Sequence, residues 1–431
     1  MHPLAFTALF ATFLLASLAL KLWLATRQMR HVARHRGQVP AAFQGVISLA
    51  THQRAADYTL AKGRFGLVQI AWSTLLLLGW TLLGGLEVLN QFLAIQVGDA
   101  LGPVAHQLLL LAAFALLSAL LEAPLDAWHT FRLEQAHGFN RMSLGLWLGD
   151  QLKGLAVGAV FGGAIAALIL WLMGAAGPAW WLWAWGAWMG FNLLILVLYP
   201  GVIAPLFNRF EPLQDEAVKR RVQALMARCG FSAQGLYVMD GSRRSAHANA
   251  YFTGFGAAKR VVFFDTLLGK LSGPELEAVL AHELGHFKHR HVPKRILGMF
   301  ALSGLGFALL GWLGQQAWFY TGLGVTPQLA LPNDALALLL FLLVGPVFSF
   351  FLGPVFAALS RRDEYQADAY AVAQTDAADL RAALLKLIED NAATLTPDRL
   401  YAAFYYSHPP AAERLAALQA LGATPQPAPA A

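Results

Sequence analysis

Residues 281–313, AHELGHFKHRHVPKRILGMFALSGLGFALLGWL, join two different kinds of helix in one short stretch. The first part carries His282 and His286 with a glutamate between them, a spacing that places both imidazoles on one helix face. After Arg295 the stretch is uncharged and long enough to cross about 30 Å of hydrocarbon at roughly 1.5 Å per residue. A polar helix with a metal-binding pattern therefore leads directly into a predicted membrane span.

The composition of the whole chain is that of a membrane protein. Of its 431 residues 57% are hydrophobic and 13% are charged, whereas an average globular domain carries about 25% charged residues. The lone cysteine, Cys229, excludes an intrachain disulfide framework and a cysteine-based zinc cluster. We predict seven transmembrane helices, at 4–25, 67–93, 104–123, 154–175, 179–204, 295–318 and 334–357.

The basic residues alternate between the two sides of the predicted spans. The loops without Lys or Arg are 94–103, 176–178 and 319–333, and the other loops and the tail are basic. By the positive-inside rule the N-terminus lies outside, and the long segment between the fifth and sixth spans and the C-terminus are cytoplasmic. This rule also explains the net charge of +6 without a nucleic-acid partner, for which no motif is present. The first span could be a signal peptide, but its basic residues follow it, which favours a retained span.

The predicted organisation is a mainly helical, polytopic membrane protein with a cytoplasmic domain that carries the His282–His286 pattern and contains a small β-sheet. The segments are 1–204 (five spans), 205–294 (the cytoplasmic segment with this pattern), 295–357 (spans six and seven), 358–419 (a second cytoplasmic segment) and 420–431 (a disordered tail). Within the second segment, 214–230 has helical spacing, and 235–240, 248–254 and 260–265 resemble strands, the last two joined by a turn at 254–256. Ser272 is the expected N-cap of the helix that carries His282.

The pattern His282-Glu283-Leu284-Gly285-His286 predicts a metal site. Two imidazoles and a carboxylate suit zinc, and a catalytic zinc usually has three protein ligands and an open position. Glu364, on the same predicted side of the membrane, supplies the third ligand. Glu283 can act as general base on a water whose pKa the metal lowers to about 7. Asp368, one helical turn after Glu364, can accept a proton from a ligand imidazole and orient it.

Plainer interpretations exist for each of these residues. The HExxH stretch could be a solvated polar face, and Glu364 could simply pair with Arg361 or Arg362. We expect His289 and His291 to be surface residues at the membrane boundary rather than ligands.

Several further motifs accompany HExxH in a characteristic order. They are 58–62 (YTLAK), 134–140 (EQAHGFN), 205–210 (PLFNRF), 244–254 (RSAHANAYFTG), 364–368 (EYQAD), and 407–410 (SHPP) with Arg414. Over roughly residues 55 to 415 the chain resembles the type I CAAX prenyl endopeptidases, integral-membrane zinc metalloproteases.

The resemblance implies a ring of seven helices around a large chamber, capped by the protease domain. It implies one zinc ion held by His282, His286 and Glu364, with Glu283 as general base. It also implies that Asn249 and Ala250 lie on an edge strand that pairs with the substrate backbone, and that His408 and Arg414 line the site as catalytic residues.

The substrate does not follow directly from the resemblance. The Ala-rich, Lys-poor composition is typical of a bacterial inner-membrane protein from a GC-rich genome, and the tail has no evident dilysine-like signal. The expected partners are therefore membrane lipid and a peptide substrate, prenylated or otherwise membrane-associated. There are three alternatives: a membrane quality-control metalloprotease, a transporter or lipid-handling protein with structural zinc, and an inactive scaffold. Relatives of the first kind usually have four spans. Structural zinc would normally have four protein ligands.

Overall fold

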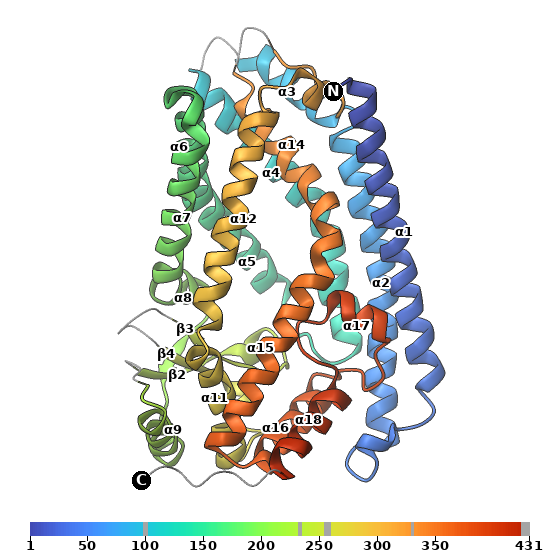
Figure 1. The fold of residues 1–431 in the computed structure, drawn as a ribbon, viewed down its shortest axis with the longest axis vertical. Helices are drawn as coiled ribbons and strands as arrows, with labels where there is room; N and C mark the ends of the chain where they lie inside the picture. Colours follow the sequence, from blue (N-terminus) through green and yellow to red (C-terminus); the bar gives the residue numbers. More distant parts are fainter. Residues whose placement is uncertain (98–101, 232–234, 254–259, 329–331, 424–431) are drawn as a thin grey trace.

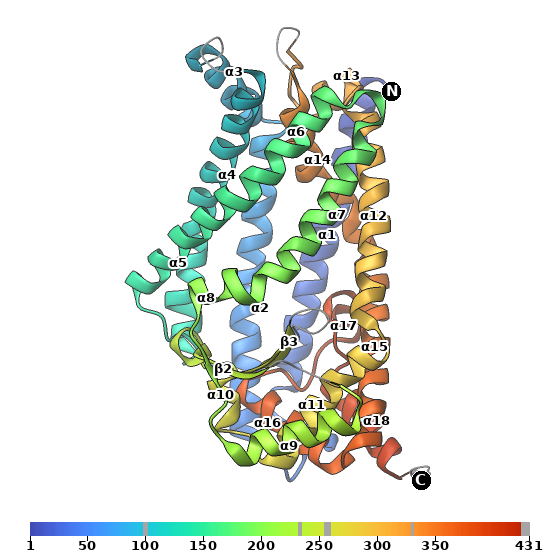
Figure 2. The same ribbon diagram turned by 90° about the vertical axis from the view of Figure 1, so that its left-hand side faces the viewer.

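The structure, a computed structural model, describes residues 1–97, 102–231, 235–253, 260–328 and 332–423. Long helices fill one part of the elongated molecule, and a smaller domain of short helices and one sheet fills the other (Figures 1 and 2). The N-terminus lies at the far end of the helical part, and helix α18 lies at the opposite end of the molecule.

Among the described residues, six helical segments are long and apolar enough to cross a membrane, and one bent pair makes a seventh. Their bounds are α1 Pro3–His35, α2 Leu49–Trp80 with α3 Gly85–Val97, α4 Pro103–Trp128, α5 Leu144–Val157 with α6 Gly163–Ala175, α7 Trp180–Leu198, α12 His291–Leu313, and α14 Asp334–Ser349 with α15 Gly353–Gln374. The connecting pieces are Ala41–Phe43, His129–Glu134, Gly158–Gly162, Gly177–Ala179, Tyr199–Ile203, α8 Ala204–Phe207, α13 Ala317–Thr321 and Phe350–Leu352. The predicted fold class, a polytopic helical membrane protein, is confirmed.

The second span differs from its prediction. A continuous helix over 67–93 was wrong, because α2 begins much earlier, at Leu49, and ends at Trp80, and α3 then leaves at 46°. Gly84 lies at the break with φ +79°, a left-handed conformation that glycine adopts without a steric penalty.

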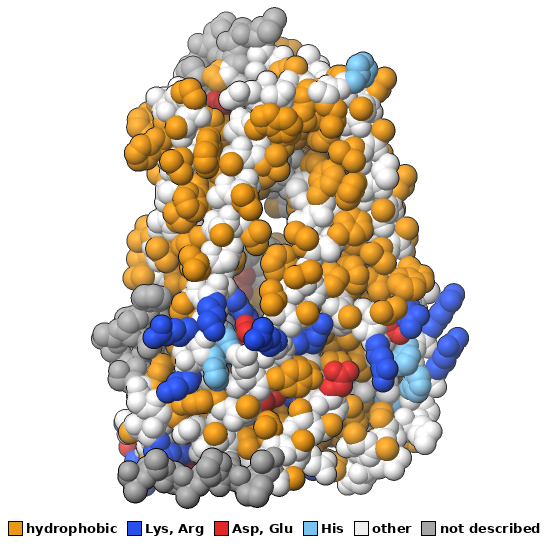
Figure 3. Space-filling view, viewed as in Figure 1, with side chains coloured by type: hydrophobic (Ala, Val, Ile, Leu, Met, Phe, Trp, Pro, Cys, Tyr) orange, Lys and Arg blue, Asp and Glu red, His pale blue; other side chains and the backbone are white. Residues whose placement is uncertain are grey.

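The long helices differ in how far they are buried. Only 6% of the most apolar stretch in the helix Val104–Glu134 is buried, against 39% in Asp334–Gln374, so most side chains of the former are at least partly exposed. Hydrophobic side chains cover this part of the surface, which is hollowed between α12 and the α14–α15 pair (Figure 3). Lys and Arg gather in a belt where the apolar surface meets the smaller domain.

The smaller domain is built on a four-stranded mixed sheet with the order β1-β2-β4-β3. Its strands are β1 Phe210–Pro212, β2 Gly235–Met239, β3 Ala250–Thr253 and β4 Arg260–Phe264, and only the β2–β4 pair is parallel. Its helices are Gly241–Arg243, α9 Glu216–Arg228, α10 Asp265–Leu268, α11 Gly273–Lys288, α16 Ala377–Asp390, α17 Arg399–Tyr405 and α18 Ala411–Ala423. The three predicted strands are present, and β1 was missed because three residues that include a proline carry no strand pattern.

Two predictions fall partly or wholly outside the described residues. The predicted turn at 254–256 lies wholly outside them. The disordered tail was wrong for residues 420–423, which belong to α18, and residues 424–431 lie outside the described part. Leu418 and Leu421 of α18 pack into the apolar core around α16, which explains why the helix extends so far.

Candidate active site

Helix α11 carries the HExxH residues, and its start is defined by a capping box. Ser272 accepts a hydrogen bond from the backbone of Glu275, and the Glu275 carboxylate accepts one from the Ser272 backbone at 2.7 Å. Lys386 of α16 also donates to this carboxylate at 2.7 Å. These contacts satisfy N–H groups that a helix start leaves unpaired and tie α11 to α16.

Helices α11 and α15 approach closely beside the site. Gly285 faces Ala367, and a Cβ added to Gly285 would lie 2.8 Å from the Cα of Ala367. This close approach brings His282, His286 and Glu364 together, with one potential ligand atom from each lying within 4.8 Å of the others. The Nε2 atoms of the two histidines lie 3.4 Å from different oxygens of Glu364.

A buried acid–base pair orients His282. Asp368 Oδ1 lies 2.8 Å from Nδ1 of His282, where it can accept a hydrogen bond and leave Nε2 free to bind a metal. Arg414 donates two hydrogen bonds to the same carboxylate, from Nε to Oδ2 at 2.7 Å and from Nη2 to Oδ1 at 2.6 Å. Arg414 therefore holds Asp368 in place as well as lining the cavity.

His291 corrects an expectation, because it is not a surface residue: only 1% of it is exposed. Its Nε2 donates to Oε1 of Gln366 at 3.0 Å, and its Nδ1 lies 2.9 Å from Nδ1 of His286. Because the Gln366 oxygen can only accept, His291 Nδ1 accepts from His286, whose Nε2 is then unprotonated and able to bind a metal. Sequence spacing missed this contact. In a continuous helix His291 would lie about 140° around from His286, but the chain turns at Arg290, which has φ +54°.

Glu283 lies beside these residues and faces the cavity. Burial raises the pKa of its carboxyl above the ordinary value, and the nearby histidines only partly oppose this shift. A raised pKa suits a carboxylate that must take up and release a proton.

The chemistry of the cluster fits a metal ion. Oxygen Oε2 of Glu364 is buried, and no described residue gives it a hydrogen bond. Oε2 faces Nε2 of His282, and Oε1 faces Nε2 of His286. Nδ1 of each of these rings is already engaged by another residue. Arg361, one of the two alternative partners expected for Glu364, instead donates to the carbonyls of Ala402 and Tyr406. Simple ion pairing of Glu364 with Arg361 is therefore excluded.

A cavity of about 660 Å³ opens in front of the cluster. Asn249, Ala250 and His408 line it together with His282 and Glu283. His408 Nε2 lies 3.4 Å from Glu364 Oε1. Strand β3 is an edge strand of the described sheet. Of the site residues expected from the sequence, six line this cavity: Asn249, Ala250, His282, Glu283, His408 and Arg414. His286, Glu364 and Asp368 lie beside His282.

These features define an integral-membrane metallopeptidase. Residues 28–209 match the family model described as CAAX prenyl protease N-terminal, five membrane helices, and residues 212–421 match peptidase family M48. Similar proteins include CAAX prenyl protease 1 homologs of Oryza sativa subsp. japonica (33% identical, covering 90% of this chain and 92% of that protein) and Homo sapiens (31%, 96% of each).

Solved structures agree with this assignment. The chain is similar to the crystal structure of S. mikatae Ste24p, with a TM-score of 0.90 and 29% identity over 96% of this chain and 99% of that one. The chain therefore belongs to the CAAX prenyl protease 1 family of M48 metalloendopeptidases. The relatives named here are eukaryotic and give no support to a bacterial inner membrane.

Proposed function

We propose that the protein is a zinc metalloendopeptidase in which His282, His286 and Glu364 hold the ion and Glu283 acts as general base. The observation that carries the proposal is the cluster of these three ligands beside the partly buried Glu283 in an open cavity. A bound zinc ion would polarise the scissile carbonyl and lower the pKa of the attacking water to about 7.

The protein side chains then handle the proton. Glu283 accepts the proton of the attacking water and delivers it to the leaving amine. Asp368 and His291 keep the two imidazoles in the orientation that leaves Nε2 toward the ion. His408, next to Glu364, is placed to donate a hydrogen bond to the oxyanion that forms from the carbonyl.

The substrate backbone binds along strand β3. The backbone N–H of Phe264 donates to the carbonyl of Asn249 at 3.0 Å, so Asn249 faces β4 and the next residue, Ala250, faces the open edge. A peptide that adds to this edge would be held extended beside Glu283, with main-chain hydrogen bonds that do not depend on its sequence.

We further propose that the protease domain is cytoplasmic and the N-terminus lies outside. The support is the belt of Lys and Arg at the boundary of this domain and the absence of both residue types from the loops at 94–103, 176–178 and 319–333. The bacterial inner membrane stays a prediction from composition. Prenylated C-terminal peptides and other membrane-associated peptides are the candidate substrates.

The test is peptide cleavage by the purified protein in detergent. One peptide carries a farnesylated C-terminal cysteine motif, and the other has the same sequence without lipid. Chelator-sensitive cleavage that is lost in Glu283→Gln supports the proposal, and the lipid dependence then tells a prenyl protease from a broader membrane peptidase. A Glu283→Gln variant that cleaves at the wild-type rate would refute the assigned role of Glu283.

A further inference from the structure

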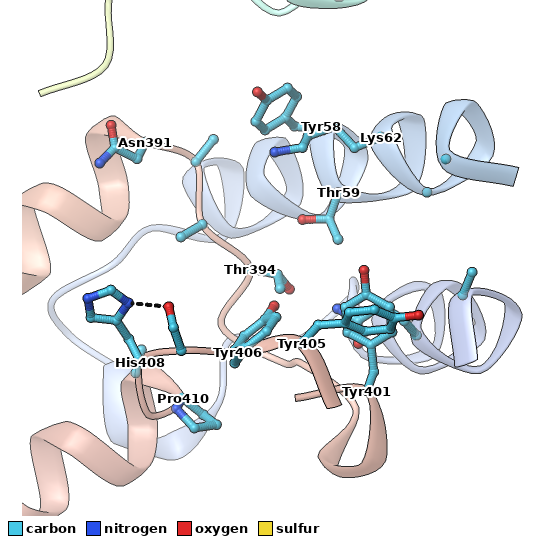
Figure 4. Close-up of a pocket in the computed structure, with 18 of the residues that line it drawn as sticks. Tyr58, Thr59, Lys62, Asn391, Thr394, Tyr401, Tyr405, Tyr406, His408 and Pro410 are labelled. Carbon is cyan, nitrogen blue, oxygen red and sulfur yellow. Dashed lines mark hydrogen bonds between the residues drawn. The ribbon is translucent and has the colours of Figure 1, made fainter. Parts of the chain in front are cut away.

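The active-site cavity continues beyond the metal-binding residues. A second hollow of about 950 Å³, bounded by α1, α2 and the α16–α18 region, borders the first. Lys62 of α2 lines both hollows, and Lys21 of α1 lines only the second. In Figure 4, Lys62 lies across the space from Asn391 and His408.

Lys62 is a cation with no acidic partner among the described residues. Its ammonium lies 5.0 Å from the centroid of the Tyr58 ring. The Glu134 carboxylate accepts a hydrogen bond from Tyr58 and lies near His129 and His247, so its partners are these residues rather than Lys62. The acids on the segments that carry Lys62 and Asn391 have other partners: Asp57 pairs with Arg36, Glu389 accepts from Thr51, and Asp390 pairs with Lys270.

A chain of polar contacts links the turn of α2 before Lys62 to the residues that precede strand β3. Tyr58, one helical turn before Lys62, donates to Glu134 at 2.7 Å, and the other oxygen of Glu134 lies 3.7 Å from His247 Nε2. Nδ1 of His247 lies 3.0 Å from Oδ1 of Asn391. Lys62, His247 and Ala250 thus line one cavity.

The direction of β3 relates Lys62 to one end of a bound peptide. The strand runs from Ala250 to Thr253, so a peptide that pairs with it antiparallel would direct its C-terminus toward Ala250 and then His247. The cavity has an apolar wall formed by Leu267, Val279, Leu384 and Leu387. An apolar wall and an unpaired cation in the same cavity suit a short apolar segment that ends in a carboxylate.

We propose that Lys62 binds the free C-terminal carboxylate of the substrate and makes the enzyme favour bonds close to a chain end. The proposal rests on the proposed peptidase function. Arg414, the other permanent cation of this hollow, is already bonded to Asp368. A charge-assisted hydrogen bond of this kind is expected to favour a free acid over an amide by about tenfold.

The experiment compares two peptides that differ only in a C-terminal carboxylate or carboxamide. We expect kcat/KM to be about tenfold higher for the free acid with the wild-type protein. The ratio should fall to about one in Lys62→Gln and be largely kept in Lys62→Arg, which preserves the charge. Lys21→Gln is the matched control, since it removes a lysine from the neighbouring hollow, and it should keep the wild-type ratio.

A binding measurement gives a readout that does not require turnover. In a Glu283→Gln background, the Kd values of the two peptides should show the same preference, again lost with Lys62→Gln. Three results would overturn the assignment to Lys62. They are equal kcat/KM and Kd values for the two peptides with the wild type, an equal fall in kcat/KM for both peptides in Lys62→Gln, and loss of the preference for the free acid in Lys21→Gln. If the wild-type protein cleaves neither peptide but the Glu283→Gln protein binds both with the stated preference, the peptidase proposal fails and the Lys62 site stands.

Discussion

Substitution of Gly285 by alanine would test whether the close approach of α11 and α15 sets the metal site. The new Cβ would lie 2.8 Å from Ala367 Cα, 3.0 Å from Ala367 O and 3.2 Å from Tyr370 Cβ. Because carbon atoms are in contact at about 3.5–4.0 Å, the two helices must separate by roughly 0.7 Å or more. Two of these three atoms are backbone, so a change of rotamer cannot relieve the clash.

The magnitude follows from two opposing effects. Overpacking costs about 1–3 kcal/mol, and replacing glycine by alanine inside a helix stabilises it by about 1 kcal/mol. The free energy of unfolding of the metal-free protein should therefore fall by at most about 2 kcal/mol. Metal affinity should fall by tenfold or more, because Glu364 moves relative to the two histidines and metal–ligand distances tolerate only about 0.2 Å.

The assay measures zinc affinity by competition with a chelator, and thermal unfolding of the chelator-treated protein. Gly298→Ala in α12 is the matched control, since a Cβ there meets no described atom within 4 Å. That variant should keep wild-type zinc affinity. A Gly285→Ala protein that binds zinc like Gly298→Ala, and is no less stable, would refute the argument from helix contact.

Three further predictions concern neighbouring contacts. His291→Ala should weaken zinc affinity by about 10–100-fold, as measured by chelator competition, because His286 loses the acceptor that orients it; unchanged affinity would contradict this role. Ser272→Ala should lower the unfolding free energy by about 1 kcal/mol through loss of the cap of α11, and an unchanged melting temperature would argue against it. Although burial favours the neutral carboxyl, hydrogen bonds with Lys386 and Ser272 hold the pKa of Glu275 below its ordinary value. The stability from Glu275 should therefore be present above about pH 4.3 and be lost as the pH falls further, so the difference in melting temperature between wild type and Glu275→Gln should shrink in acid; a constant difference would refute it.

Periodicity and local sequence pattern were sufficient to predict much of the fold and of the candidate site. Long apolar runs predicted the membrane helices, since crossing hydrocarbon requires such runs whatever the helices contact. The four-residue spacing of His282 and His286 predicted a shared helix face, and the same spacing placed Asp368 one turn from Glu364. The division of the chain into five segments stays a prediction.

Contacts between distant segments could not be predicted in this way. The break between α2 and α3 was missed because a pair of glycines in an apolar run does not reveal whether neighbouring helices hold the chain straight. His291 was assigned to the surface because its position depends on the turn at Arg290. The extent of α18 depends on its packing against α16, which no local pattern in an Ala- and Pro-rich tail reports.

The sequence by itself determined that this protein is a membrane-embedded metallopeptidase, because hydropathy and the HExxH spacing are properties of single segments. Only the tertiary structure decided which groups orient the metal ligands and where the cavity leads. Asp368 and His282 are 86 residues apart, Arg414 reaches them from α18, and Lys62 reaches the cavity from α2. Such contacts arise when helices pack against one another, and their strength depends on burial and on distances that a linear pattern does not contain.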